Sequence, residues 1–149
     1  MSDPKSILVP TDFSTYSDAA LKKAVELAEK FNSKIYLLHV IDKAIQQCAV
    51  DYCITPDVVS QLEEQGIKAS NDNLRDEANK IIGAKNLDVV FDVQKGHPAE
   101  VILKEQQDKG IDLIVIASHG KSGILKNLMG SVANKVIKGS KCPVMVVKP

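Results

Sequence analysis

The most informative segment of the chain is residues 112–132, which read DLIVIASHGKSGILKNLMGSV. The segment opens with a continuous apolar run, Leu113–Ala117, which predicts a buried strand. A glycine-spaced loop follows, and Gly130-Ser131 is typical of the start of a helix. Backbone N–H groups converge at such a loop, and the helix dipole favours an anion. The segment therefore predicts a site that binds phosphate.

Outward from this segment, apolar strands alternate with amphipathic helices along the whole chain. This alternation predicts an α/β fold, a single domain over residues 1–149 with a doubly wound, five-stranded parallel sheet covered on both faces. The predicted strands are Lys5–Pro10, Ile35–Ile41, Val89–Val93, Leu113–Ala117 and Val144–Val147. The predicted helices run from Ser17-Asp18 to Phe31, from Pro56 to about Gly83, from Pro98 through Leu103, and over Ser131–Lys138, with a loop over Asp42–Thr55.

The strand order of such a sheet determines which loops meet. If the chain winds outward through its first three strands and then returns, the order is 3-2-1-4-5 and the fourth strand lies beside the first. The loop at Pro10–Ser14 then lies next to the loop at 118–131, at the carboxyl ends of the two strands. Ligands of doubly wound sheets bind at this switch point, so we expect the site there.

Composition excludes several classes of function. Nineteen basic residues balance nineteen acidic ones and are mixed along the chain, so we expect no nucleic-acid partner. No segment reaches the roughly 20 apolar residues of a membrane span, and the first apolar run is too short for a signal peptide. The three cysteines lack zinc-site spacing and are too few for a disulfide framework. We expect a cytoplasmic protein with reduced thiols and no membrane partner.

Generic nucleotide and catalytic motifs do not fit. A P-loop ending at Gly120-Lys121 would need glycine at position 115, where the chain has valine, and no GxGxxG follows the first strand. His39, His97 and His119 do not form a metal-binding pattern. Ser118 and His119 are sequence neighbours, which is poor geometry for a general-base pair, so we predict no catalytic residues.

Four stretches of the chain together resemble the universal stress protein family. They are ILVPTDFS at 7–14, LLHVID at 37–42, Gly96-His-Pro98 and the segment from Asp112 to Gly120. The nucleotide-binding branch of that family carries G-x2-G-x9-G-[S/T], which Gly120 and Gly130-Ser131 match. Alanine stands at position 117, where the pattern begins with glycine. The resemblance implies a Rossmann-like fold of the adenine nucleotide alpha hydrolase-like type.

The resemblance also implies an ATP site, with Mg²⁺ carried by the nucleotide. Gly120 and Gly130 would let the backbone approach the triphosphate, Ser131 and the Val132 amide would bind phosphate oxygens, and Lys121 would add a positive charge. The two oxygens of Asp12 suit the ribose 2′- and 3′-hydroxyls. The predicted binding residues are Pro10, Thr11, Asp12, Val40, Ile116, Ala117, Gly120, Lys121, Gly130, Ser131 and Val132, with Val40, Pro10 and Thr11 against the adenine.

The sequence leaves alternatives open at these positions. Asp12 is alternatively a turn or capping residue before the first helix. Ala117 would crowd a ligand that passes close to its Cα, would cost roughly 1–2 kcal/mol at positive φ, and would cost almost nothing in strand geometry. The function implied is a nucleotide-dependent sensor or regulator in stress responses. The alternatives are a dimeric interaction protein of the same fold that binds no nucleotide, and a slow ATP hydrolase.

The last strand predicts self-association. Val144–Val147 is an apolar terminal strand whose unpaired N–H and C=O groups invite another chain. Proteins that resemble this family commonly pair this strand with its symmetry mate, so we expect a homodimer through Val144–Val147. Shielding of the edge by Pro143 and Pro149 is the alternative.

Overall fold

The computed structural model describes residues 2–42, 55–121 and 128–149. Five parallel strands form one sheet in the order β3-β2-β1-β4-β5, which confirms the predicted order and fold class. The elements in chain order are β1 (Ser6–Pro10), α1 (Thr15–Phe31), β2 (Lys34–Asp42), α3 (Pro56–Ile81), β3 (Val89–Gly96), α4 (Pro98–Asp108), β4 (Leu113–Ala117), α5 (Ser131–Gly139) and β5 (Val144–Val147).

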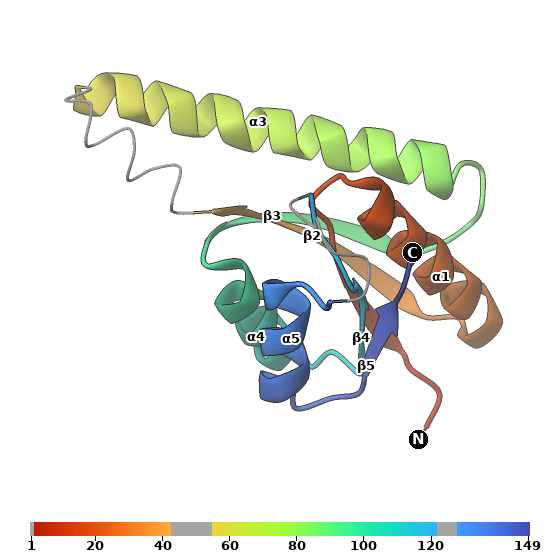
Figure 1. Ribbon diagram of the computed structural model, residues 1–149. Coiled ribbons are helices and arrows are strands. Elements are labelled where there is room, and N and C mark those ends of the chain that lie inside the picture. The colour runs from red at the N-terminus through yellow and green to blue at the C-terminus, as the bar shows by residue number, and fades with distance from the viewer. Residues whose placement is uncertain (1, 43–54, 122–127) are drawn as a thin grey trace.

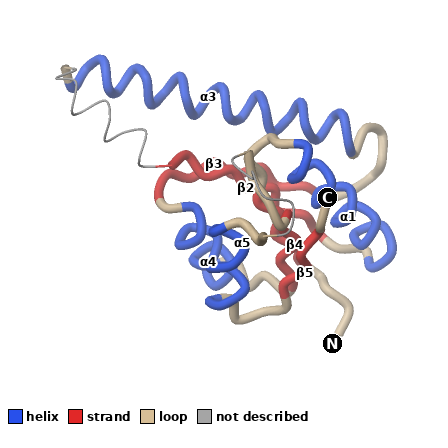
Figure 2. The backbone as a smooth tube through the Cα atoms, in the orientation of Figure 1, coloured by secondary structure: helices blue, strands red, loops and turns tan. Residues whose placement is uncertain are grey.

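The helices cover both faces of the sheet. Helices α1 and α3 lie on one face, and α4 and α5 on the other (Figure 1). The strands form the central layer between the helices, and α3 extends past the sheet at its N-terminal end (Figures 1 and 2). The 26 residues of α3 include Gly66, so the helix tolerates the loss of about 1 kcal/mol that glycine brings.

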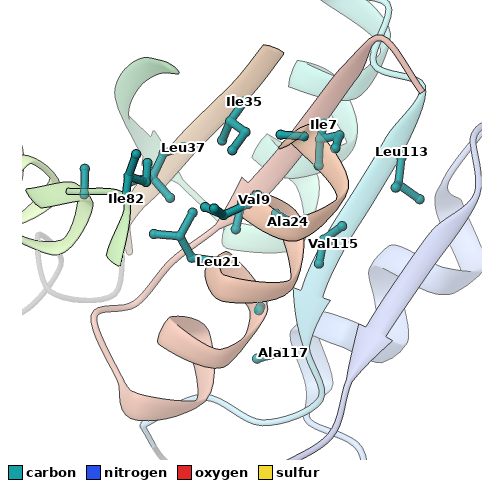
Figure 3. Packing of buried hydrophobic residues seen from close by; sticks show 14 of the residues in the cluster. Ile7, Val9, Leu21, Ala24, Ile35, Leu37, Ile82, Leu113, Val115 and Ala117 are labelled. Atoms are coloured by element: carbon teal, nitrogen blue, oxygen red, sulfur yellow. The ribbon is translucent and has the colours of Figure 1, made fainter. Parts of the chain in front are cut away.

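Side chains that alternate along the buried strands build two separate cores. On the α1 face, Val9, Leu21 and Val115 belong to one cluster, which Figure 3 shows packed between α1 and the sheet. On the other face, Leu8, Ile114 and Ile116 pack against Ile102 of α4. Strands buried on both sides read as continuous apolar runs, and for this reason the sequence pattern predicted β4 to the residue.

Several predicted boundaries were wrong. Helix α1 begins at Thr15, with the Ser14 side chain as N-cap accepting from the Ser17 amide, and not at Ser17-Asp18. Strand β3 continues to Gly96, because its last four residues pair with β2 through Asp42. Most of the predicted loop over Asp42–Thr55 lies outside the described residues, as do residues 122–127 of the glycine loop.

Two sequence expectations are tested only for part of the chain. Across the described residues, no helix is both long enough and apolar enough to span a membrane. Cys142 is a free, half-buried thiol, whereas Cys48 and Cys53 lie outside the described ranges.

Candidate functional site

The loops after β1 and β4 meet at the carboxyl edge of the sheet. These two strands are neighbours, with Ile7 beside Leu113 and Leu8 beside Ile114. A hydrogen bond joins the loops directly, because the backbone N–H of Lys121 donates to Asp12 Oδ2 at 2.9 Å. The two segments that the sequence singled out are therefore in contact, although 109 positions separate these residues.

A cavity of about 560 Å³ opens where these loops meet. The volume lies within the range of roughly 300–1,000 Å³ that is common for small-molecule sites. All eleven residues predicted to bind the nucleotide line the cavity: Pro10, Thr11, Asp12, Val40, Ile116, Ala117, Gly120, Lys121, Gly130, Ser131 and Val132. Ten further residues were not predicted: Ser17, Leu38, Asp42, Pro98, Ile102, Ser118, His119, Leu128, Met129 and Ala133.

The sequence contained a usable signal for some of the missed residues. Asp42 ends β2, and Ser118 and His119 directly follow β4, so all three lie at the edge of the parallel sheet where residues were selected. Leu38 lies in the middle of β2, beside Pro10 of β1. Pro98 and Ile102 come from α4, and only the packing of that helix on the sheet brings them to the cavity.

Asp12 links both loops through its two carboxylate oxygens. Oδ1 accepts from the Ser14 amide at 3.0 Å and from the Ser17 hydroxyl at 3.1 Å, and Oδ2 accepts from Lys121. Burial alone would raise the pKa of Asp12, but the hydrogen bonds from Ser14, Lys121 and Ser17 outweigh it and bring the pKa below 3.8. Asp12 is thus ionised near neutral pH and serves as the turn residue that the alternative interpretation described.

This arrangement leaves limited capacity for a ligand on Asp12. A carboxylate offers about four lone-pair sites, and three are used within the protein. The remaining site is on Oδ2, so Asp12 can accept directly from one ligand hydroxyl while its present bonds persist. The sequence had suggested two hydroxyls, one for each oxygen.

The two glycines of the family pattern let parts of the protein approach each other closely. A Cβ on Gly120 would lie 2.7 Å from Asp12 Oδ2, closer than any carbon side chain tolerates. A Cβ on Gly130 would lie 3.1 Å from the Ser118 carbonyl oxygen, which already accepts from the Gly130 amide at 2.6 Å. The absence of a Cβ at both positions therefore allows the two loops to approach each other closely, whether or not a phosphate is bound.

Helix α5 begins at the cavity. Gly130 is its N-cap, in extended geometry, and Ser131 and Val132 form its first turn beside the cavity lining. The first N–H groups of a helix have no acceptor within the helix, and they carry the positive end of its dipole. This end of α5 can therefore bind an anion, and Lys121 adds a positive charge to the same cavity.

Ala117 lies in strand geometry, which rules out the interpretation that this position requires a positive φ. It is the last residue of β4 and pairs with Val147 of β5, and positive φ occurs at Phe13 and Asn32 among the described non-glycine residues. Its side chain belongs to the α1-side core, close to α1 in Figure 3. Ile116, the preceding residue, packs on the α4 side together with Val40. The methyl group therefore brings no backbone strain.

Phe13 gives the loop after β1 an unusual conformation. Its φ is 64°, a left-handed value that costs a non-glycine residue about 1–2 kcal/mol. The Phe13 amide donates to Thr11 Oγ1 at 3.0 Å, and its ring packs on His39 with centroids 4.4 Å apart. His39 Nδ1 in turn donates to the Thr11 carbonyl oxygen at 2.8 Å. These contacts hold the strained loop in place.

Two histidines lie close to the loops of the site. His39 of β2 is hydrogen-bonded to the Thr11 carbonyl oxygen, and burial lowers its pKa. Ser118 Oγ and His119 Nδ1 lie 2.8 Å apart and are buried, a contact that their sequence adjacency had not led us to expect. Within the described ranges, no three His, Cys, Asp or Glu side chains gather closely enough to hold a metal ion.

Comparison with known proteins places the chain in one group. The model of the universal stress protein family matches residues 4–148. Universal stress protein MJ0577 of Methanocaldococcus jannaschii is 35% identical over 97% of this chain and 94% of its own length. Universal stress protein MJ0531 of the same organism is 32% identical over 97% of this chain and 82% of its own length.

Solved structures agree on the fold. The structure of MJ0577 has a TM-score of 0.84 at 30% identity and covers 99% of this chain and 98% of that chain. A universal stress protein in complex with cAMP has a TM-score of 0.71 at 23% identity, covering 99% and 98% of the two chains. One from Archaeoglobus fulgidus in complex with dAMP has a TM-score of 0.58 at 18% identity, covering 99% and 100%. At these lower identities, the likeness extends to the fold alone.

Proposed function

The chain belongs to the universal stress protein family, and we propose that it binds ATP in the cavity at the carboxyl ends of β1, β2 and β4. In this proposal it acts in the cytoplasm as a nucleotide-dependent regulator of stress responses. The observation that carries the proposal is the Asp12–Lys121 hydrogen bond, which joins the two halves of the predicted site around one cavity.

The chemistry of the lining assigns each part of the nucleotide a place. The adenine would pack against the apolar wall of Pro10, Val40 and Ile116. One ribose hydroxyl would donate to the free lone pair of Asp12 Oδ2. The phosphates would lie at the start of α5, against Ser131 and the Val132 amide, with Lys121 as a counter-charge. Mg²⁺ would arrive with the phosphates and offset their charge.

Two proteins of this fold are described in complex with adenine nucleotides, one with cAMP and one with dAMP. These complexes support an adenine nucleotide as the ligand of this cavity, but they do not indicate how many phosphates it carries. The start of α5 and Lys121 favour a ligand with several phosphates, since a helix N-terminus and a lysine both attract negative charge.

Ala117, in place of the glycine of the nucleotide-binding pattern, would favour a branch of the family that binds no nucleotide. Its strand geometry and its packing on the α1 side show that the alanine brings no backbone strain to the site. ATP binding is therefore favoured over the interaction protein that binds no nucleotide, and measurements of binding and turnover distinguish it from that protein and from a slow hydrolase.

We also propose a homodimer through β5. Strand β5 lies at one edge of the sheet, and its four residues are all half-buried. Pairing with a second β5 around a two-fold axis would satisfy the outer N–H and C=O groups of both strands.

The test of ATP binding has two parts. The purified protein is denatured and the supernatant is chromatographed for released adenine nucleotide, and thermal unfolding is then measured with and without Mg-ATP. We expect ATP to be released or to raise the melting temperature. An empty protein that shows no thermal shift would refute the proposal, and steady turnover well above background would instead favour the hydrolase.

A charge variant locates the phosphates. Ser131→Glu places a carboxylate at the start of α5, where it stabilises the helix dipole but repels phosphate. Asn134→Glu adds the same charge one turn later on the exposed side of α5 and serves as the control. We expect Ser131→Glu to weaken ATP at least tenfold and adenosine much less, with Asn134→Glu near wild type. Equal affinities in the two variants would show that the phosphates lie elsewhere.

A further inference from the structure

A buried carboxyl group lies directly behind the cavity, and the proposed function does not use it. Glu77 of α3 is 7% exposed, and its neighbours along the helix, Leu74 and Ala78, are core residues. Both carboxyl oxygens lie within hydrogen-bond distance of Thr11 Oγ1, at 3.0 and 2.9 Å. An acidic residue is rarely buried to this extent without a basic partner, so its position requires an explanation.

A chain of hydroxyl groups connects Glu77 to Asp12. Thr11 Oγ1 lies 3.0 Å from Ser17 Oγ, and Ser17 Oγ lies 3.1 Å from Asp12 Oδ1. Each hydroxyl has one hydrogen to donate. The direction of the chain is therefore set at its Glu77 end, by whether that carboxyl group donates or accepts.

The two protonation states of Glu77 order the chain differently. A protonated Glu77 donates to Thr11, which leaves Thr11 to donate to Ser17 and Ser17 to donate to Asp12. An ionised Glu77 takes the Thr11 hydrogen for itself. Ser17 Oγ also lies 3.0 Å from the Ser14 carbonyl oxygen, so three acceptors, Thr11, Ser14 and Asp12, then compete for its single hydrogen. The protonated state thus removes Thr11 from the acceptors that compete with Asp12 for the Ser17 hydrogen.

Charges around Glu77 act on the same equilibrium. Burial and the nearby carboxylates of Asp18 and Asp12 raise the pKa of Glu77 to about 7, against the opposing effect of the Thr11 hydrogen bond. Lys80, also on α3, contacts Asp18 at 3.2 Å. On the sheet side, His39 is bonded to the Thr11 carbonyl oxygen, and burial lowers its pKa. A ligand with several negative charges would disfavour a further buried charge at this place.

We infer that Glu77 is a positioning residue for the nucleotide cavity, which binds its anionic ligand more tightly when Glu77 is protonated. The inference rests on the proposed function, since it concerns the affinity of the same cavity. Nucleotide binding is then coupled to proton uptake near neutral pH, through Thr11 and Ser17.

The magnitude follows from proton linkage. If binding raises the pKa of Glu77 by about one unit, the protonated form binds about tenfold more tightly than the ionised form. With a starting value of about 7, the dissociation constant of wild type then rises about fivefold between pH 6 and pH 8.

The test compares wild type with Glu77→Gln, whose side chain has nearly the same shape and stays neutral. Mg-ATP affinity is measured by calorimetry at pH 6, 7 and 8, in buffers of different ionisation enthalpy that report protons taken up. Asp76→Asn is the matched control, because it removes the same charge from the adjacent, exposed position of α3. Titration of the nucleotide itself and of His39 is common to all three proteins and cancels in the differences.

We expect Glu77→Gln to lose the fivefold rise of the dissociation constant between pH 6 and pH 8 that Glu77 causes, together with the proton uptake by Glu77. Asp76→Asn should retain both. If ATP binds with the same pH profile in wild type and Glu77→Gln, the inference is wrong while the proposed function stands. If ATP binds to none of the three proteins, the proposed function fails and the inference fails with it.

Discussion

Replacement of Glu77 by glutamine should change how the stability of the nucleotide-free protein depends on pH. The pKa of Glu77 is raised from 4.5 to about 7 in the folded state, so the folded protein holds this proton more tightly than the unfolded chain does. Stability from this group is fully present below pH 4.5 and is lost as the pH rises through about 7. At 1.36 kcal/mol for each pH unit, the loss amounts to about 3 kcal/mol. Glutamine does not titrate and avoids it.

Urea denaturation followed by circular dichroism, at intervals from pH 5 to pH 9, measures this effect. From pH 5 to pH 9, we expect the free energy of unfolding of Glu77→Gln to rise by up to about 3 kcal/mol relative to that of wild type. Its slope against urea concentration should be the same in both proteins. Asp76→Asn controls for removal of an exposed charge from the same helix and should run parallel to wild type. If the Glu77→Gln profile is also parallel to wild type, Glu77 does not titrate in this range and the reasoning is refuted.

Three further predictions follow from other positions. Gly66→Ala should raise the free energy of unfolding by about 0.5–1 kcal/mol in urea, because Gly66 lies within α3 and an added Cβ has no neighbour within 4 Å; a loss of stability would contradict this. Gly120→Ala should weaken nucleotide binding at least tenfold in calorimetry, because its methyl would displace Asp12; unchanged affinity would mean that this contact is dispensable. Light scattering should give twice the chain mass of 16.2 kDa, and Val146→Lys should yield monomers; a wild-type monomer at high micromolar concentration would refute the β5 dimer.

The fold was largely predictable from local pattern. Apolar runs identified all five strands, and the run is unbroken in β4, because a strand that is covered by helices on both faces must be apolar at successive positions. In the edge strand β3, Asp92 interrupts the run. The strand order followed from general rules of doubly wound sheets and was confirmed. Element ends were less predictable. The start of α1 depends on the Ser14 cap, and the end of β3 depends on pairing with β2.

The candidate site was predictable where residues lie at strand ends and in the glycine loop. The sequence placed Asp12, Val40, Gly120 and Gly130 together, and all four line one cavity. Their detailed roles were not predictable. That Gly120 is needed for the approach of Asp12, and that Ala117 directs its methyl toward the α1 core, depend on side-chain directions and on distances below 4 Å.

The sequence by itself determined the type and order of the elements and the family to which the chain belongs, because apolar periodicity and glycine spacing are local properties. Only the tertiary structure decided that Glu77 lies against Thr11, 66 positions away, and that Lys121 bonds Asp12, 109 positions away. The first contact arises from the packing of α3 on the sheet, and the second from the return of the chain that places β4 beside β1. No local pattern encodes them, because they depend on which faces meet when the sheet and its helices assemble.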